Sequence, residues 1–200
     1  MLFRSRASVT GRGVVTLQES VCRELSATTV DDARDVYAAI RCARPGGLGR
    51  ADEQDVAGEP TVTLLETMLL AAARDAVARE YATGFDVTFG IGVPALERAR
   101  RDGLVWDDAI VETFLTLLAA SRDTHISRRA GAATADEVTS LARATLDAGG
   151  VRSAAGRRAI EEMDRKLRGA DNTRNPGTTA DLTAASIFVV LLGGGWNVQR

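Results

Sequence analysis

The residues best suited to chemistry lie in a polar loop at 172–181 that runs directly into an apolar helix. A Pro-Gly pair ending at Gly177 predicts a turn, and Thr178 with Asp181 three residues later predicts a capping box. The first turn of a helix has unpaired N–H groups and a positive dipole end, and Arg174 lies close by in the sequence. The segment therefore suits a phosphate or another anion. The alternative is a well-capped core helix whose polar loop binds nothing.

Two further polar segments, 45–55 and 123–131, also mix arginine, glycine and carboxylates. A phosphorylated ligand needs this mixture, because arginine forks bind phosphate oxygens, glycine allows close backbone approach and carboxylates hold magnesium. The candidate ligand-binding residues of the three segments include Gly46, Gly47, Gly49, Arg50, Arg128, Arg129, Arg174 and Asn175. The alternative for the two adjacent arginines of the second segment is a pair of surface cations.

Carboxylates and the one histidine of the chain are the candidates for acid–base and metal chemistry. His125 is a candidate general base, with a ligand contact or a structural role as the alternatives. With one histidine and no paired cysteine spacing, a bound metal would be held by oxygen ligands, which indicates magnesium rather than zinc. The candidate magnesium ligands are Asp52, Asp55, Asp123 and Asp181. Their alternative roles are a helix cap for Asp181, a helix end for Asp123 and solvated charge for Asp52 and Asp55.

The composition of the 200-residue chain is that of one ordinary globular domain, with 45% hydrophobic and 26% charged residues. A net charge of −2 argues against a protein that binds nucleic acid through a basic surface. Cys22 and Cys42 stand alone in the sequence, which fits a reducing cytoplasm. No apolar run is long enough to span a bilayer, so we expect no membrane insertion.

Apolar residues at helical spacing predict an all-α fold, a single domain of about eight helices without a sheet. Thr29 with Asp32 predicts a capping box at the start of the second helix, and Thr134 with Glu137 predicts another further along. Pro60 at a first helical position predicts one long helix that runs to about residue 82.

Two segments depart from regular helical periodicity. The apolar, glycine-containing segment 85–94 alternates poorly for a strand and predicts a closely packed, broken helix. Residues 1–13 show neither periodicity nor turn signals, and we expect them to be non-native or disordered. The helical domain is therefore expected at 14–195.

Two motifs follow one another in the second half of the chain. Asp-Thr-His-Ile at 123–126 precedes Arg-Arg-Ala-Gly at 128–131, and Asn-Pro-Gly-Thr-Thr-Ala-Asp-Leu at 175–182 runs into the apolar helix. They resemble the Asp-Thr-Asn-aliphatic, Arg-x-Gly and Ser-Pro-Gly-Gly-Ser-Ala-Asp-Leu motifs of the triphosphoribosyl-dephospho-CoA synthase family. The stretches 43–49 and 59–62 resemble the branch of that family found in methylotrophs and methanogens. The family's Lys-Pro-Gly and Asn-Thr-Asn motifs are missing, so we expect an N-terminally truncated member that begins partway through a longer protein.

The resemblance implies a transferase that moves a triphosphoribosyl group from ATP to a ribose hydroxyl of dephospho-CoA, or of a related acceptor, and releases adenine. The product would be the precursor of a lyase prosthetic group, with a variant linked to one-carbon metabolism as the alternative. The resemblance also implies that Asp123 and Asp181 act as base or magnesium ligands and that His125 contacts ribose or adenine. The phosphates would be bound by Arg128, Arg129 and Arg174, with help from the N–H groups of Gly177, Thr178 and Thr179.

Two other functions stay open at this point. An all-α, magnesium-dependent nucleotide phosphohydrolase would use the same carboxylates and arginines but would release phosphate rather than adenine. An inactive helical fragment would bind no ATP. We expect the ligands to be ATP and a dephospho-CoA-like acceptor, with neither nucleic acid nor membrane as a partner. A homodimer is one option for the oligomeric state.

Overall fold

The structure is a computed structural model that describes residues 11–44, 48–169, 172–194 and 196. Within these ranges the chain forms helices joined by loops and no strand, so the all-α prediction is confirmed, with ten α-helices in place of about eight. Helix α1 starts inside the segment that the sequence predicts to be non-native or disordered, and residues 1–10 lie outside the described part. The elements are α1 (Gly11–Ser26), α2 (Val30–Ala43), α3 (Leu64–Ala71), α4 (Ala76–Thr83), the π-helix η1 (Thr88–Gly92), α5 (Val93–Arg101), α6 (Trp106–Ala120), α7 (Thr124–Ala130), α8 (Ala132–Asp147), the 3-10 helix η2 (Gly150–Arg152), α9 (Ala154–Leu167) and α10 (Gly177–Leu192).

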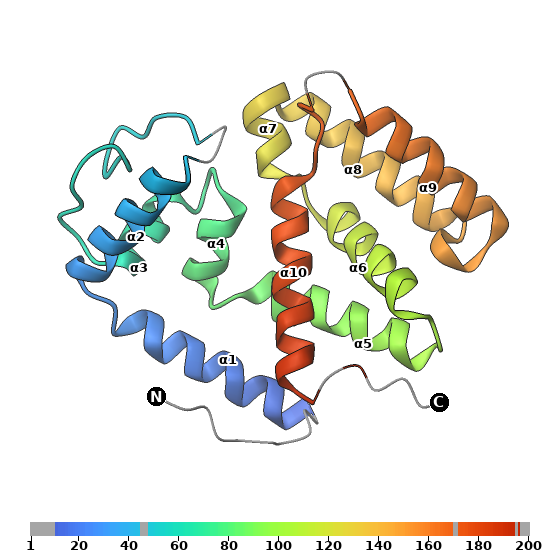
Figure 1. The fold of residues 1–200 in the computed structure, drawn as a ribbon, viewed down its shortest axis with the longest axis horizontal. Helices are drawn as coiled ribbons and strands as arrows, with labels where there is room; N and C mark the ends of the chain where they lie inside the picture. Colours follow the sequence, from blue (N-terminus) through green and yellow to red (C-terminus); the bar gives the residue numbers. More distant parts are fainter. Residues whose placement is uncertain (1–10, 45–47, 170–171, 195, 197–200) are drawn as a thin grey trace.

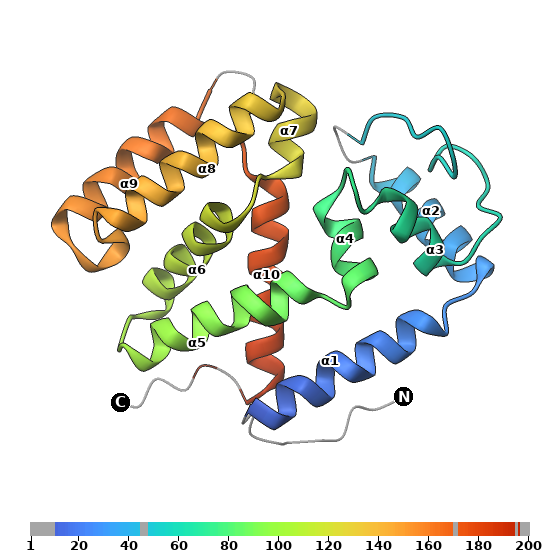
Figure 2. The ribbon, with the colours of Figure 1, turned by 180° about the vertical axis from the view of Figure 1, so that it is seen from behind.

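Helix α10 runs through the middle of the fold (Figure 1). Helices α1 to α4 lie on one side of it and α6, α8 and α9 on the other, and Figure 2 shows the same arrangement from behind. It packs against α4, η1, α5, α6 and α7. Its first turn therefore lies between the two halves of the fold. Among the described residues, no helix combines the length and the apolar character that crossing a membrane requires.

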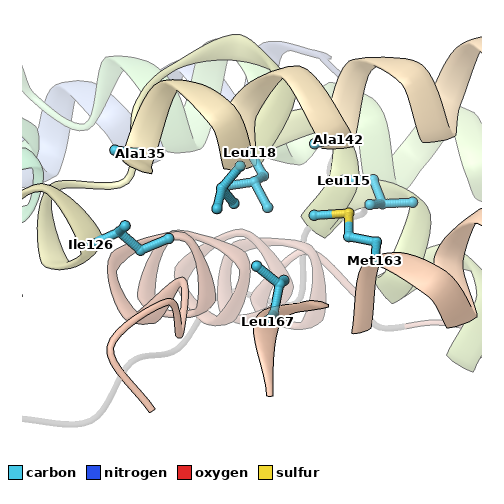
Figure 3. Packing of buried hydrophobic residues seen from close by; sticks show 8 residues of the cluster. Leu115, Leu118, Ile126, Ala135, Ala142, Met163 and Leu167 are labelled. Atoms are coloured by element: carbon cyan, nitrogen blue, oxygen red, sulfur yellow. The ribbon is translucent and has the colours of Figure 1, made fainter. Parts of the chain in front are cut away.

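Two apolar clusters hold these helices together. In the first, Leu118 of α6 and Ile126 of α7 pack in one cluster with Met163 of α9 (Figure 3). In the second, Leu96 of α5 packs with Val190 of α10. The first cluster fixes the position of α7, and the second fixes that of α10, so both helices that carry the sequence motifs are anchored in hydrophobic cores.

The predicted long helix from Pro60 is wrong, because two short helices stand in its place. The first, α3, starts after Thr63, whose hydroxyl accepts the N–H of Glu66, while the Glu66 carboxylate accepts the N–H of Thr63. The second, α4, starts anew after Asp75, which is its N-cap. The break places Asp75 at the start of a helix rather than inside one.

One of the three predicted capping boxes is confirmed, that of Thr29 with Asp32 at the start of α2. The boxes predicted at Thr134 and Thr178 are wrong, because α8 and α10 begin before these residues. The hydroxyl of Thr134 donates instead to the carbonyl of Ala130. A threonine followed by an acid three residues later therefore marks a helix start to within a turn, but it does not fix the N-cap.

The segment 85–94 is a broken helix, as predicted, with the π-helix η1 leading directly into α5. Here α10 crosses so closely that a Cβ added at Gly92 would lie 1.9 Å from the Ser186 Oγ and 2.9 Å from its Cβ. Gly92 is needed at this position because α10 passes directly over it. By contrast, Gly90 in the same π-helix has no neighbouring atom within 4 Å of such a Cβ.

We expect Gly92→Ala to lower the free energy of unfolding by about 1–3 kcal/mol, because the added methyl group overpacks the crossing with α10. The matched control is Gly90→Ala, which meets open space and should leave stability unchanged or raise it by up to about 1 kcal/mol. Urea unfolding followed by circular dichroism measures both. Equal effects of the two substitutions would show that the crossing at Gly92 can relax freely.

Candidate active site

The starts of α4, α7 and α10 meet at one point near the middle of the fold (Figure 1). The hydroxyl of Thr124, the first residue of α7, accepts the N–H of Ala76, the first residue of α4, at 3.1 Å. It also bonds the hydroxyl of Thr178 in the first turn of α10 at 3.1 Å. Three helix starts, each with a positive dipole end, are therefore joined through one threonine.

The carboxylate of Asp123 fastens α7 to α10 from inside. Its side chain is 2% exposed, and its Oδ1 accepts the N–H groups of His125 at 2.8 Å and Ile126 at 3.1 Å. Its Oδ2 accepts both the N–H and the hydroxyl of Thr179, at 2.7 and 2.8 Å. These four bonds use both oxygens, and Asp123 does not line the cavity described next. Its geometry is that of a buried link between two helices.

A cavity of about 800 Å³ lies between α2, α3, α4, the loop 48–56 and the starts of α7 and α10. It brings together part of each of the three polar segments. The predicted site residues that line it are Gly49, Arg50, Asp52, Asp55, His125, Arg128, Gly177, Thr178 and Asp181. Its volume falls within the range of pockets that enclose a small organic ligand.

The remaining predicted site residues do not line this cavity. Thr179 is buried behind the cavity, where its N–H donates to Asp123. Arg129 and Asn175 are exposed elsewhere. Arg174 pairs with Glu137 at 3.3 Å. Gly46 and Gly47 lie outside the described residues. Of Arg128, Arg129 and Arg174, which are predicted to bind phosphate, Arg128 is therefore the one that lines the cavity.

Asp181 lines the cavity from the second turn of α10, and within the described chain its carboxylate makes no hydrogen bond or ion pair. Burial raises the pKa of this carboxyl above its ordinary value, and the nearby charge of Asp123 raises it further. The charge of Asp75 adds to the increase in pKa, and His125 opposes it. Asp181 thus faces the cavity as a carboxylate that binds a proton more readily than an aspartate with the ordinary pKa does.

His125 lies beside Asp181 at the start of α7, and its ring packs over the start of α10. A Cβ added at Gly177 would lie 3.3 Å from the His125 Cγ, so glycine leaves room for the imidazole. The ring lines the cavity, while the backbone N–H of His125 is held by Asp123. The two predicted catalytic groups at the cavity wall are therefore His125 and Asp181.

The sequence does not predict several cavity residues, and two of them, Arg74 and Asp75, bind groups of the predicted set. One Asp75 oxygen accepts the N–H of Ala78, and the other lies 2.6 Å from a guanidinium nitrogen of Arg128. Arg74 donates to the carbonyl of Arg50 at 3.2 Å and so holds the loop 48–56 against α4. Aspartate is a typical N-cap residue, so Asp75 carries a local signal for a helix start. That signal is hidden because Asp75 lies inside an apparently continuous helical pattern.

The loop 48–56 is held by hydrogen bonds to its own backbone and to α2. The Asp55 carboxylate accepts the N–H groups of Ala51 at 2.6 Å and Ala57 at 2.9 Å, and these bonds lower the pKa of Asp55. The Tyr37 hydroxyl donates to the carbonyl of Gln54 at 2.5 Å. Asp55 therefore shapes the loop with both of its oxygens.

The predicted set of four carboxylate ligands for magnesium is not assembled. Among the described residues, no three side chains of histidine, cysteine, aspartate or glutamate are grouped closely enough to hold a metal ion. The physical reason is that the oxygens of Asp123 and Asp55 already accept backbone N–H groups, while Asp52 lies on the exposed loop across the cavity from Asp181.

The fold and the cavity together define a helical protein with a pocket of the size of a nucleotide, in which arginines and carboxylates line the wall beside apolar residues. Residues 3–200 match the family described as ATP:dephospho-CoA triphosphoribosyl transferase, and the chain belongs to that family. The branch found in methylotrophs and methanogens stays a prediction.

The similar proteins carry the matching name. A Pseudomonas fluorescens protein named as a 2-(5''-triphosphoribosyl)-3'-dephosphocoenzyme-A synthase is 36% identical over 124 residues, which are 62% of this chain and 42% of that protein. A Pseudomonas paraeruginosa protein of the same name is 38% identical over 123 residues, 60% of this chain and 41% of the other. The matched segment is thus less than half the length of these curated relatives.

One solved structure has the same fold. The crystal structure of an Archaeoglobus fulgidus protein, titled as a triphosphoribosyl-dephospho-CoA synthase, superimposes with a TM-score of 0.68 at 28% identity. The match covers 92% of this chain and 74% of that one. The helical arrangement around the cavity is therefore that of the family.

We expect Asp123→Ala to lower the free energy of unfolding by about 3 kcal/mol, because it leaves the buried N–H of Thr179 and the start of α7 without an acceptor. The matched control is Asp181→Ala, which removes no hydrogen bond within the described chain and should change stability by less than about 0.5 kcal/mol or raise it. Chemical unfolding at neutral pH measures both. Equal losses of stability would contradict the assignment of a structural role to Asp123 and a chemical role to Asp181.

Proposed function

We propose that this chain transfers a triphosphoribosyl group from ATP to a ribose hydroxyl of dephospho-CoA and releases adenine. The observation that carries the proposal is the convergence of Asp181 and His125 in one cavity with three arginines, inside a fold that belongs to the transferase family. The names of the relatives support the same reaction for those proteins. The cavity supplies the groups that the reaction needs.

The reaction exchanges one bond at C1′ of the ATP ribose. The hydroxyl oxygen of the acceptor forms a bond to C1′, and the bond from C1′ to N9 of adenine breaks. Its electron pair leaves with adenine, which gains a proton, while the acceptor hydroxyl loses one. A positively charged, oxocarbenium-like ribose lies between the two states, so a carboxylate close to C1′ stabilises it.

Asp181 is suited to accept the hydroxyl proton. It has no hydrogen-bond donor within the described residues, and its raised pKa makes it a stronger base than an ordinary aspartate. His125 lies close enough to influence its charge and is suited to donate a proton to the departing adenine. Asp123 does not touch the cavity and holds both residues in place.

The triphosphate is expected at the arginine-lined part of the cavity. Arg50, Arg74 and Arg128 line the cavity, and the first turn of α10 presents the N–H group of Thr178, whereas the N–H of Gly177 donates to the carbonyl of Asn175. Asp75 orients the guanidinium of Arg128 toward α4. These groups can bind the phosphate oxygens from several directions.

Magnesium fits this cavity as a companion of the triphosphate rather than as a resident ion. Mg²⁺ is commonly bound through one or two carboxylates, substrate phosphates and water. Asp181 would contribute a carboxylate to such an ion, whose chemistry would be to neutralise charge on the phosphates. Asp55, Asp75 and Asp123 each use both oxygens in other interactions.

The test is to incubate the full chain with ATP, Mg²⁺ and dephospho-CoA and to separate the products by chromatography. We expect one adenine released for each acceptor consumed, and no adenine without acceptor. ATP alone should raise the melting temperature, since a ligand at 100 times its Kd adds about 2.7 kcal/mol of stability. Release of phosphate instead of adenine would establish a phosphohydrolase. Neither product, with no thermal shift, would leave a non-catalytic helical protein.

We expect Asp181→Asn to reduce adenine release by about 10²–10⁴-fold, because the amide cannot accept the proton. The variant should be at least as stable as the original chain at neutral pH. A carboxyl whose pKa is raised by folding binds its proton more tightly in the folded state, so its ionised form opposes folding once the pH exceeds the folded-state pKa. The substitution removes that penalty.

The stability advantage of Asp181→Asn should therefore shrink as the pH falls through the acidic range and vanish below the ordinary aspartate pKa of about 3.9, where the carboxyl is protonated in both the folded and the unfolded state. Thermal unfolding at several pH values measures it. Normal turnover would remove Asp181 from the mechanism, and a stability loss at neutral pH would contradict the burial argument.

A further inference from the structure

The cavity has an apolar part on the side away from α7 and α10. Ile40 of α2, Leu48 of the loop, and Met68 and Leu70 of α3 line this apolar side. Figure 1 shows α2 and α3 on the far side of α4 from α7 and α10. Charged residues lie next to it, because Arg50 lines the cavity from the same loop and Arg74 lines it from directly after α3. The apolar side is therefore bordered by arginines that can bind phosphate groups.

One cavity of this size does not enclose both substrates of the proposed reaction. A volume of about 800 Å³ lies within the range that holds one drug-sized ligand, of roughly 300–1,000 Å³. ATP alone is about the size of such a ligand and dephospho-CoA is larger, so the two together exceed the cavity. If both riboses meet at Asp181, part of the acceptor must leave the cavity through its opening.

Leu70 marks the opening on the apolar side. It lines the cavity, yet its side chain is 52% exposed, so it lies at the rim. The segment 67–73 around it carries no charged residue. An exposed leucine in this uncharged segment can bury an uncharged, partly apolar chain, while Arg74 directly after the segment suits a phosphate.

We propose that the apolar side of the cavity, from Met68 to the rim at Leu70, binds the pantetheine arm of the acceptor. The proposal rests on the proposed function, since it divides the same cavity between two substrates. The arm is long, narrow and uncharged at neutral pH, and it is the part of dephospho-CoA that ATP lacks. Leu70 is thereby a specificity-determining residue that distinguishes the acceptor from simple nucleotides.

The experiment compares dephospho-CoA with ADP, which is the same molecule without the pantetheine arm. Their Kd values are measured by calorimetry on the full chain, on Leu70→Ala and on the matched control Leu69→Ala. Leu69 is 53% exposed on the same helix but does not line the cavity. We expect dephospho-CoA to bind the original chain more tightly than ADP. Leu70→Ala should weaken dephospho-CoA by about five- to tenfold and leave ADP and ATP unchanged, and Leu69→Ala should change none of them.

Each other outcome overturns the proposal in a recognisable way. Equal binding of dephospho-CoA and ADP to the original chain would show that the arm makes no contact. Equal weakening of both ligands by Leu70→Ala would place a purine ring on the apolar side. Equal effects at Leu69 and Leu70 would indicate a general disturbance of α3. Because these are binding measurements, they are independent of adenine release, and the proposed function fails separately if no adenine appears.

Discussion

The buried carboxylate of Asp123 is the interaction on which the site depends. Removing an ionised group from water is costly, and here four donors and the starts of two helices offset that cost. The bonds hold the first turns of α7 and α10 at one distance and orientation. His125 lies in the first turn of α7 and Asp181 in the turn that follows the first turn of α10, so Asp123 sets their separation although it lies outside the cavity.

The same charge has a chemical consequence. A carboxylate placed behind Asp181 raises the pKa of Asp181, since two negative charges close together oppose ionisation. A neutral link of equal strength would hold the helices without this effect. Asp123 therefore both links the two helices and raises the pKa of Asp181, the carboxyl that faces the cavity.

The sequence predicts the three polar segments and the helical frame well, because helix starts and apolar periodicity are local signals. It does not predict which aspartate is buried. Asp123 and Asp181 both stand where a polar segment becomes a helix, and Asp123 reaches Thr179 across 56 positions of the chain. Asp75 is hidden for another reason, since the break between α3 and α4 interrupts a pattern that reads as one helix. Burial and such breaks are decided by packing partners distant in sequence.

The carboxylates of the cavity differ in what their oxygens already do, and this difference identifies the reactive one. Asp55 shapes its loop, Asp75 caps α4 and holds Arg128, and Asp52 is exposed on the loop. Asp181 has no donor in the described chain, and desolvation together with nearby negative charge raises its pKa. A partly desolvated carboxylate without donors is unfavourable for folding. Its retention beside arginines and a histidine is explained if its partner is the substrate.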